Sequence, residues 1–159
     1  MNYGQNMRDI RDLYELTQQD VANILHIARS TYKQYEMQYD IIPIKHLNNF
    51  CNYFNVSFDY MFNFTIKKKY SDEIKEISTE ISGKRIKSLR KEFKLTQDKL
   101  ARKLNVANTI ICEYERGHHL ISTATLYALS KEFKISSDYL LGKTNETKHL
   151  ETKKALVMN

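Results

Sequence analysis

Two segments of the chain spell nearly the same ten residues, LTQQDVANIL at positions 16–25 and LTQDKLARKL at positions 95–104. The offset of 79 residues continues outward in both directions without a gap, pairing residues 7–65 with residues 86–144. Sixteen of these 59 pairs are identical, and most other apolar positions stay apolar. A unit this long in two copies predicts two tandem domains, because a solenoid stacks shorter repeats in larger number.

The composition favours helices, since the 159 residues include four Gly and one Pro. Apolar residues recur at helical spacing and predict five helices per copy. In the later copy, Thr96 can cap the second helix, Ala101 allows a close crossing with the third, and Asn105 suits a turn with positive φ. Thr17, Ala22 and His26 hold these positions in the first copy. The chain is therefore expected to be all-α, with a helix-turn-helix in each copy.

The segment LTQDKLARKLNVANTIICEYERG (95–117), followed by SSDYLLG (136–142), resembles the lambda-repressor-like family of helix-turn-helix proteins, the Cro/repressor or Xre type. The segment LTQQDVANILHIARSTYKQYE (16–36), followed by SFDYMF (57–62), resembles it a second time. The resemblance implies two tandem five-helix DNA-binding domains in a bacterial or phage protein. It also implies double-stranded DNA as the partner and sequence-specific transcriptional regulation, in the form of a repressor that blocks promoter access.

The glutamine that opens the second helix lies against a DNA phosphate in this family. The resemblance therefore implies phosphate contacts for Gln18 and Gln97. A helix N-terminus carries a partial positive charge and free N–H donors, which suits that role. The alternative is that each glutamine is an ordinary polar residue at a helix start.

The third helix of the first copy groups Arg29, Ser30, Lys33 and Gln34 on its outer face, at helical spacing. The resemblance implies that Arg29, Ser30 and Gln34 reach base edges. Their chemistry agrees, because arginine can fork onto guanine and glutamine onto adenine. An ordinary solvated helix face is the alternative.

The second copy places Asn108, Thr109, Cys112 and Glu113 on the same face. Asn108 and Thr109 are candidate base readers. Glu113 is unusual there, because phosphates repel a carboxylate unless it accepts a hydrogen bond from a cytosine amine.

The loop after the third helix differs between the copies. In the second copy it reads RGHH and offers Arg116, His118 and His119 to phosphates. In the first copy the matching residues, 37–40, read MQYD, which departs from the family pattern of glycine and basic residues. The first copy thus has the better reading helix and the second the better grip on the DNA backbone.

Two arginine–glutamate pairs resemble the internal ion pair that joins the first and third helices in this family. They are Arg11 with Glu36 and Arg90 with Glu115, and we expect them to be structural. Removing one partner of such a pair leaves an unpaired buried charge.

The charge is unevenly distributed along the chain, whose net charge is +6. Residues 1–65 hold 5 basic and 7 acidic residues, net −2, whereas residues 84–144 hold 13 and 6, net +7. A basic excess suits a polyanionic partner. The acidic first copy leaves open a second hypothesis, in which residues 1–65 bind a protein partner, as in antitoxin-type relatives, while residues 84–144 bind DNA.

Residues 66–83 separate the two predicted domains (1–65 and 84–144), and residues 145–159 form a polar tail. Apolar residues recur in the connection at spacings of four, three and four: Tyr70, Ile74, Ile77 and Ile81. They predict an amphipathic helical linker, capped by Ser71 and ended by Gly83. Its stripe would pack on the chain's own domains or form a homodimer with the same stripe of a second chain.

Other classes of protein fit the sequence poorly. There is no apolar run of about 18 residues and no signal-peptide pattern, so a cytoplasmic protein without a membrane segment is expected. The chain shows no catalytic constellation and no metal-ligand spacing. We therefore expect no enzymatic activity, no cofactor and no metal, and we expect Cys51 and Cys112 to be reduced.

Overall fold

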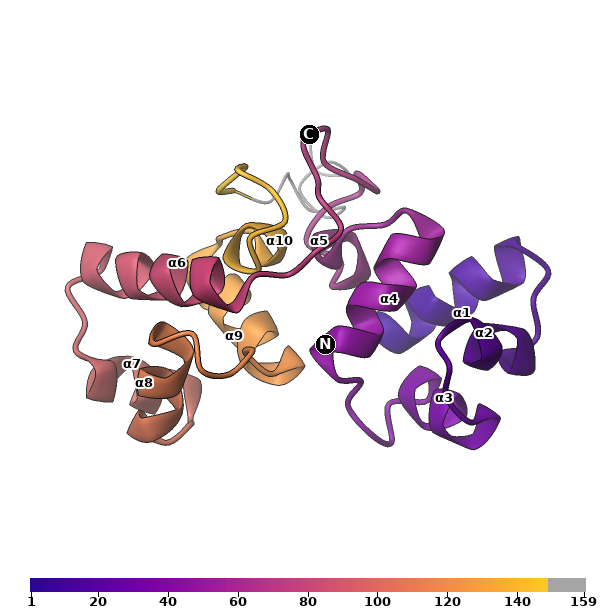
Figure 1. Cartoon of the computed structure of the whole chain (residues 1–159), viewed down its shortest axis with the longest axis horizontal. Helices are drawn as coiled ribbons and strands as arrows, with labels where there is room; N and C mark the ends of the chain where they lie inside the picture. Colours follow the sequence, from indigo (N-terminus) through magenta and orange to yellow (C-terminus); the bar gives the residue numbers. More distant parts are fainter. Residues whose placement is uncertain (149–159) are drawn as a thin grey trace, which may run out of the picture. The chain divides into compact units, whose positions relative to one another are not determined.

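The structure is a computed structural model that describes residues 1–148 (Figure 1). Those residues form ten helices and no strand, which confirms the predicted all-α class and the five helices of each copy. The chain divides into two compact units, residues 1–69 and residues 70–148. Within the described residues, no helix is long and apolar enough to cross a membrane.

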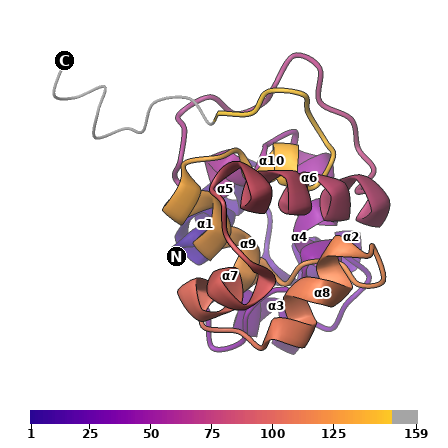
Figure 2. The same cartoon turned by 90° about the vertical axis from the view of Figure 1, so that its left-hand side faces the viewer.

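The first unit contains α1 (Tyr3–Leu13), α2 (Gln18–Ile24), α3 (Arg29–Glu36), α4 (Ile44–Phe54) and α5 (Phe58–Met61). The second contains α6 (Thr79–Glu92), α7 (Gln97–Leu104), α8 (Asn108–Glu115), α9 (Thr123–Phe133) and α10 (Ser137–Leu140). In each unit, apolar residues from all five helices form one buried core. Figure 2 shows α6 lying across the unit above α7 and α8.

Each helix is followed, one or two residues after its end, by a residue with positive φ. These residues pair across the units at the same offset of 79, although only two of them are glycine. The pairs are Glu15 and Lys94, His26 and Asn105, Gln38 and Gly117, Asn55 and Lys134, and Asn63 and Gly142. A left-handed residue stops a helix and turns the chain. The duplication therefore preserves the chain reversals even where the residue types have changed.

The repeat extends beyond its sequence match to a glycine in the first helix of each unit. A Cβ on Gly4 would lie 2.3 Å from the Glu36 carbonyl oxygen, and one on Gly83 would lie 2.5 Å from that of Tyr114. Both glycines are needed because the first and third helices touch backbone to backbone. The expectation that Gly83 ends a linker helix is wrong, since it lies inside α6.

The predicted linker helix is also wrong over residues 66–77, which are irregular with a few turns and bends, and Ser71 lies in a turn. Tyr70 is 5% exposed but Ile74 is 51% exposed, so the expected apolar stripe does not form. The backbone bonds elsewhere instead, because the N–H of Ile74 donates to the Lys143 carbonyl at 2.8 Å. Short helices are marginal by themselves and yield to such competition.

The structure also changes the expectations of a homodimer through the linker and of a separate tail from residue 145 onward. Without a linker helix, the homodimer expected through its stripe loses its basis. Residues 145–148 of the predicted tail lie in the second unit, where the Ser136 N–H donates to the Thr147 carbonyl at 2.8 Å. Residues 149–159 lie outside the described part of the chain.

Substituting Gly83→Ala tests the close crossing of α6 and α8. In an unobstructed helix this change would stabilise by about 1 kcal/mol. Here the added methyl meets two backbone carbonyls, at 2.5 and 2.9 Å, and we expect a loss of about 1–3 kcal/mol in the free energy of unfolding. Urea unfolding followed by circular dichroism measures it, with Ser88→Ala on the exposed face of α6 as the control. A stabilised variant would contradict the crossing.

Candidate nucleic-acid interface

The helix-turn-helix of each unit is formed by α2 and α3, and by α7 and α8. Ala22 and Ala101 are 0% and 2% exposed, as expected of small residues where the second helix is covered. His26 and Asn105 have φ of 56° and 55°, which confirms the left-handed turn predicted for them. The sequence thus determines the angle of this turn locally, through residues that tolerate positive φ.

A fully bonded arginine–glutamate pair connects the three helices around the second turn. Arg90 donates to both carboxylate oxygens of Glu115, from Nε at 2.5 Å and from Nη2 at 3.1 Å. Its remaining nitrogen donates to the Leu95 carbonyl at 2.8 Å. Gln97 adds a bond from Nε2 to the same carboxylate at 2.8 Å. This cluster, the Arg–Glu–Gln lock, ties α6, the start of α7 and the end of α8 together.

The first unit holds the same lock with one weaker bond. Arg11 donates to Glu36 at 2.8 and 3.0 Å and to the Leu16 carbonyl at 3.0 Å. Gln18 lies 3.4 Å from the carboxylate, at the long limit of a hydrogen bond. Burial raises the pKa of Glu36, but the hydrogen bonds and the positive charge around it, those of Arg11 foremost, together outweigh burial, so the pKa lies below its usual range. The hydrogen bond to Glu36 raises the pKa of Arg11.

The two glutamines expected at phosphates therefore also bond inside the protein. Each sits at the first position of its helix, behind a threonine cap whose oxygen accepts a backbone N–H. In Gln97, the amide that binds Glu115 keeps a second N–H and its oxygen. The lock thus holds this side chain at the helix start, where the sequence predicted its phosphate contact.

The outer face of α3 carries the residues predicted to read bases in the first unit. Arg29, Ser30 and Lys33 are exposed, while Gln34 is half-buried. Ser30 and Gln34 line a shallow hollow that continues to Asp40 in the following loop. The structure brings these side chains together on one surface, away from the buried Tyr32 and Glu36.

The outer face of α8 contains an interaction that the sequence did not predict, between Glu113 and the histidines of the following loop. Asn108 and Thr109 are exposed, and Cys112 is half-buried. Glu113 lies 3.0 Å from Nδ1 of His118 and 3.7 Å from Nε2 of His119. The acid that seemed out of place is held by the loop histidines. A carboxylate five residues before a histidine, across a helix end, was the available signal.

The loop after the third helix shows the largest difference between the units. In the first unit it exposes Met37, Tyr39 and Ile41, by 47%, 70% and 52%. In the second unit the counterparts of Met37 and Tyr39 are the exposed Arg116 and His118. One loop is therefore apolar on its surface and the other is cationic.

The first turns of α3 and α8 lack side-chain caps. Ala28 and Ala107 occupy the cap positions and accept no side-chain bond from the helix. Neighbouring Ser30 and Asn108 do not replace the cap. The first N–H groups of these two helices thus have no side-chain acceptor at the cap position, which leaves donors for an anion.

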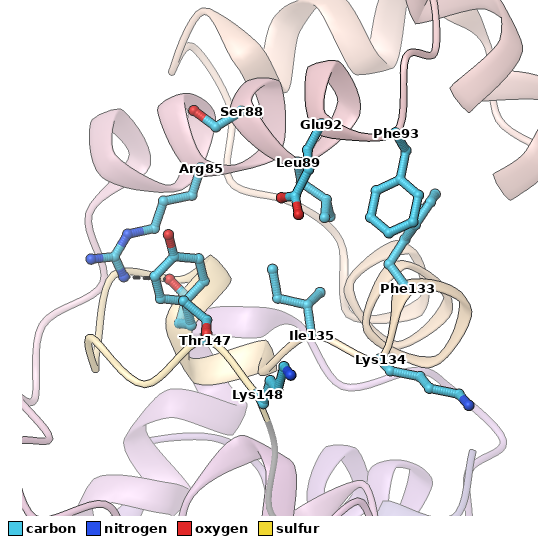
Figure 3. A pocket seen from close by; sticks show the side chains of 11 residues that line it. Arg85, Ser88, Leu89, Glu92, Phe93, Phe133, Lys134, Ile135, Thr147 and Lys148 are labelled. Carbon is cyan, nitrogen blue, oxygen red and sulfur yellow. Dashed lines mark hydrogen bonds between the residues drawn. The ribbon is translucent and has the colours of Figure 1, made fainter.

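A pocket of about 360 Å³ lies elsewhere in the second unit, between α6 and the end of α9 (Figure 3). Phe93 and Phe133 face each other on one side, with ring centroids 4.7 Å apart. On the other side Arg85 stacks over Tyr139 at 4.0 Å and donates to its carbonyl at 2.6 Å. Arg85 thereby fastens α6 to α10 and has a structural role. Within residues 1–148, no three His, Cys, Asp or Glu residues gather as a metal site.

Comparisons with known proteins find this class of domain in both units. A family model described as "Helix-turn-helix" matches residues 7–61, and one described as "Helix-turn-helix domain" matches residues 83–146. Each unit therefore contains a helix-turn-helix domain of the lambda-repressor-like, Xre type.

One curated relative is the HTH-type transcriptional regulator ImmR of Bacillus subtilis (strain 168), which is 43% identical over 70 residues. The match covers 44% of this chain and 55% of the relative, so the chain spans about half the length of that protein. No solved structure matches the chain.

Arg90→Ala tests the Arg–Glu–Gln lock. The side chain of Glu115 is 4% exposed, so losing its partner leaves a buried charge, and we expect a loss of about 3–5 kcal/mol in the free energy of unfolding of the second unit. Arg102→Ala is the matched control, because it breaks an exposed pair with Asp98, which contributes less than about 1 kcal/mol. Thermal and urea unfolding measure both. Equal stability of the two variants would show that the lock is not structural.

Proposed function

We propose that the chain is a sequence-specific double-stranded DNA-binding transcriptional regulator that represses by occupying promoter DNA. One observation carries this proposal. In each unit the second helix of the helix-turn-helix has a locked inner face, an uncapped N-terminus and an exposed polar outer face. A helix held in this way can enter the major groove without reorganising.

The second unit supplies most of the grip on the DNA backbone. Its residues 84–144 have a net charge of +7, and Arg116 is exposed directly after α8. His118 and His119 lie beside it, held toward Glu113. Gln97 adds an amide at the start of α7. Contacts of this kind set the position of a protein on DNA and provide affinity without sequence preference.

The first unit supplies base contacts, and the second adds fewer. Arg29 and Gln34 have the fork and amide geometry that suit guanine and adenine. Ser30 and Lys33 lie beside them on the same exposed side of α3. In the second unit Asn108 and Thr109 take this role, and Glu113 accepts from a cytosine amine if the histidines release it. Because the units differ in these residues, their half-sites differ in sequence.

The repressor role follows from the proposal that both units bind DNA. A protein that covers promoter DNA excludes polymerase by occupancy and needs no further contact surface. The relative ImmR is named a transcriptional regulator, which supports a role in transcription for this chain.

A second candidate function is favoured by the loop of the first unit. Met37, Tyr39 and Ile41 expose apolar surface where a DNA-binding loop would carry cations, and residues 1–65 have a net charge of −2. Exposed apolar clusters are typical of protein contacts. In this alternative the first unit binds a protein partner and the second alone binds DNA.

The proposed function is tested by selecting bound sequences from random duplex DNA and measuring the affinity of the best one against salt. Lysines and arginines at about six phosphates displace condensed counterions, so we expect the logarithm of affinity to fall with the logarithm of salt with a slope of about −5. An unrelated duplex of equal length is the control for specificity. A slope near zero, or no enrichment of any sequence, would overturn DNA binding.

Arg29→Ala separates the two candidate functions. If α3 reads bases, the change costs about 1–3 kcal/mol of binding free energy and relaxes preference at one base pair. Arg8→Ala, which removes an exposed arginine from α1, is the matched control and leaves base preference unchanged. Binding is measured on single-base variants of the selected duplex. If Arg29→Ala, Lys33→Ala and Gln34→Ala all bind every variant as the unmodified protein does, the first unit does not read DNA.

A further inference from the structure

The segment between the two helix-turn-helix domains is fastened to the second unit over residues 70–78, which we call the strap. The Ile74 N–H donates to the Lys143 carbonyl at 2.8 Å, and the Ser78 N–H donates to the Leu141 carbonyl at 3.2 Å. The strap therefore follows the chain that leaves α10, and α6 begins directly after it, with Ser78 as its cap.

Side chains strengthen this attachment. Asp72 accepts from the Thr144 hydroxyl at 2.5 Å and from the Asn145 N–H at 2.9 Å, and these bonds lower the pKa of its carboxyl. The Glu73 carboxylate lies 3.7 Å from the Lys143 ammonium, and their side chains are 6% and 0% exposed. A buried pair is costly to break from one side. The strap is thus a fixed part of the unit.

The position of Lys143 holds a different kind of residue in the first unit. The residue that matches Lys143 at the offset of 79 is Phe64, which packs against Phe62 with ring centroids 5.9 Å apart. Phe64 therefore completes an aromatic core, whereas Lys143 turns to Glu73 in the strap. Lys143 thus gives the strap a buried partner at a position where the first unit has an aromatic ring.

The tether between the units is correspondingly short. At the end of the tether that belongs to the first unit, the Ser57 N–H donates to the Lys68 carbonyl at 2.6 Å, which attaches residue 68 to that unit. With Asp72 attached, the chain from Lys68 to Asp72 can span at most about 14 Å. If residues 70–77 detached from the second unit, the chain from Lys68 to Ser78 could span about 35 Å.

We propose that the strap sets the length of the tether and thereby limits the spacing between the two DNA half-sites that the chain can occupy. The DNA part rests on the proposed function, whereas the tether part does not. A long tether lets the second unit search many positions, while a short one raises its effective concentration at a matching spacing and lowers it elsewhere. The strap is then a specificity element that touches no base.

The test uses the full chain with Asp72→Ala, Glu73→Gln and Ile74→Pro combined, and the glutamine removes the ion pair with Lys143. Proline removes the N–H that bonds to Lys143, at a side chain that is 51% exposed, and alanine removes both bonds of Asp72. Ile74→Ala is the matched control, because it removes the side chain and keeps the N–H. Circular dichroism confirms that each variant retains its helices.

The tether is measured without DNA. Spin labels on Lys45→Cys and Ala124→Cys, which occupy matching exposed positions in the two units, report the distance between them, in a Cys112→Ser background. We expect the unmodified strap and the Ile74→Ala control to share one distribution. The released variant should extend to longer distances, by up to about 20 Å. Equal distributions in all three proteins would overturn the proposal.

The spacing is measured on duplexes that carry the two selected half-sites with zero to three inserted base pairs, each adding about 3.4 Å. For the protein with an intact strap, three inserted base pairs should reduce the affinity for DNA by about 10-fold. For the released variant, the same insertion should reduce the affinity by about 3-fold or less. Equal losses would overturn the spacing claim. If no protein binds even a single half-site, the proposed function fails, while the spin-label distances still decide whether the strap sets the tether.

Discussion

A buried glutamate at the end of the third helix of each unit is the constraint on which both domains depend. Glu36 and Glu115 are the last residues of α3 and α8, where the partial negative charge of a helix end disfavours a carboxylate. Arg11 and Arg90 offset both this charge and the cost of burial with forked hydrogen bonds. The first helix is thereby fixed to the third, and the second helix joins through its opening glutamine. The duplication kept the residues of this arrangement while the surfaces around it diverged.

The locked inner face explains why the outer faces could diverge. Side chains such as Arg29 and Asn108 contribute little to the core, so their exchange leaves the fold intact. The loops after the third helices differ most: the loop around Tyr39 exposes apolar side chains, and the loop around Arg116 exposes basic ones. Under the proposed function, a single chain with two unequal faces would recognise an asymmetric DNA site, which a symmetric dimer of one domain does not match.

Local features of the chain could be predicted from sequence, and features set by distant partners could not. Helical periodicity and the repeat indicated the ten helices, and His26 and Asn105 marked the turns because their types tolerate positive φ. Lys94 and Lys134 take the same conformation without any such signal. The connection at residues 66–77 has a helical pattern, yet its bonds to a segment about 70 residues later decide its structure. The lock was expected from the resemblance, but the glutamine bond within it was not.

Docking of both units on one DNA molecule is tested most directly by hydroxyl-radical footprinting of the selected duplex with the full chain. Two half-sites of different sequence should each show protected sugars, and saturation should need one chain per duplex. Arg29→Ala should weaken protection of one half-site more than of the other. One protected half-site at saturation, unchanged by Arg29→Ala, would contradict docking by both units and would leave DNA binding to residues 70–148 alone.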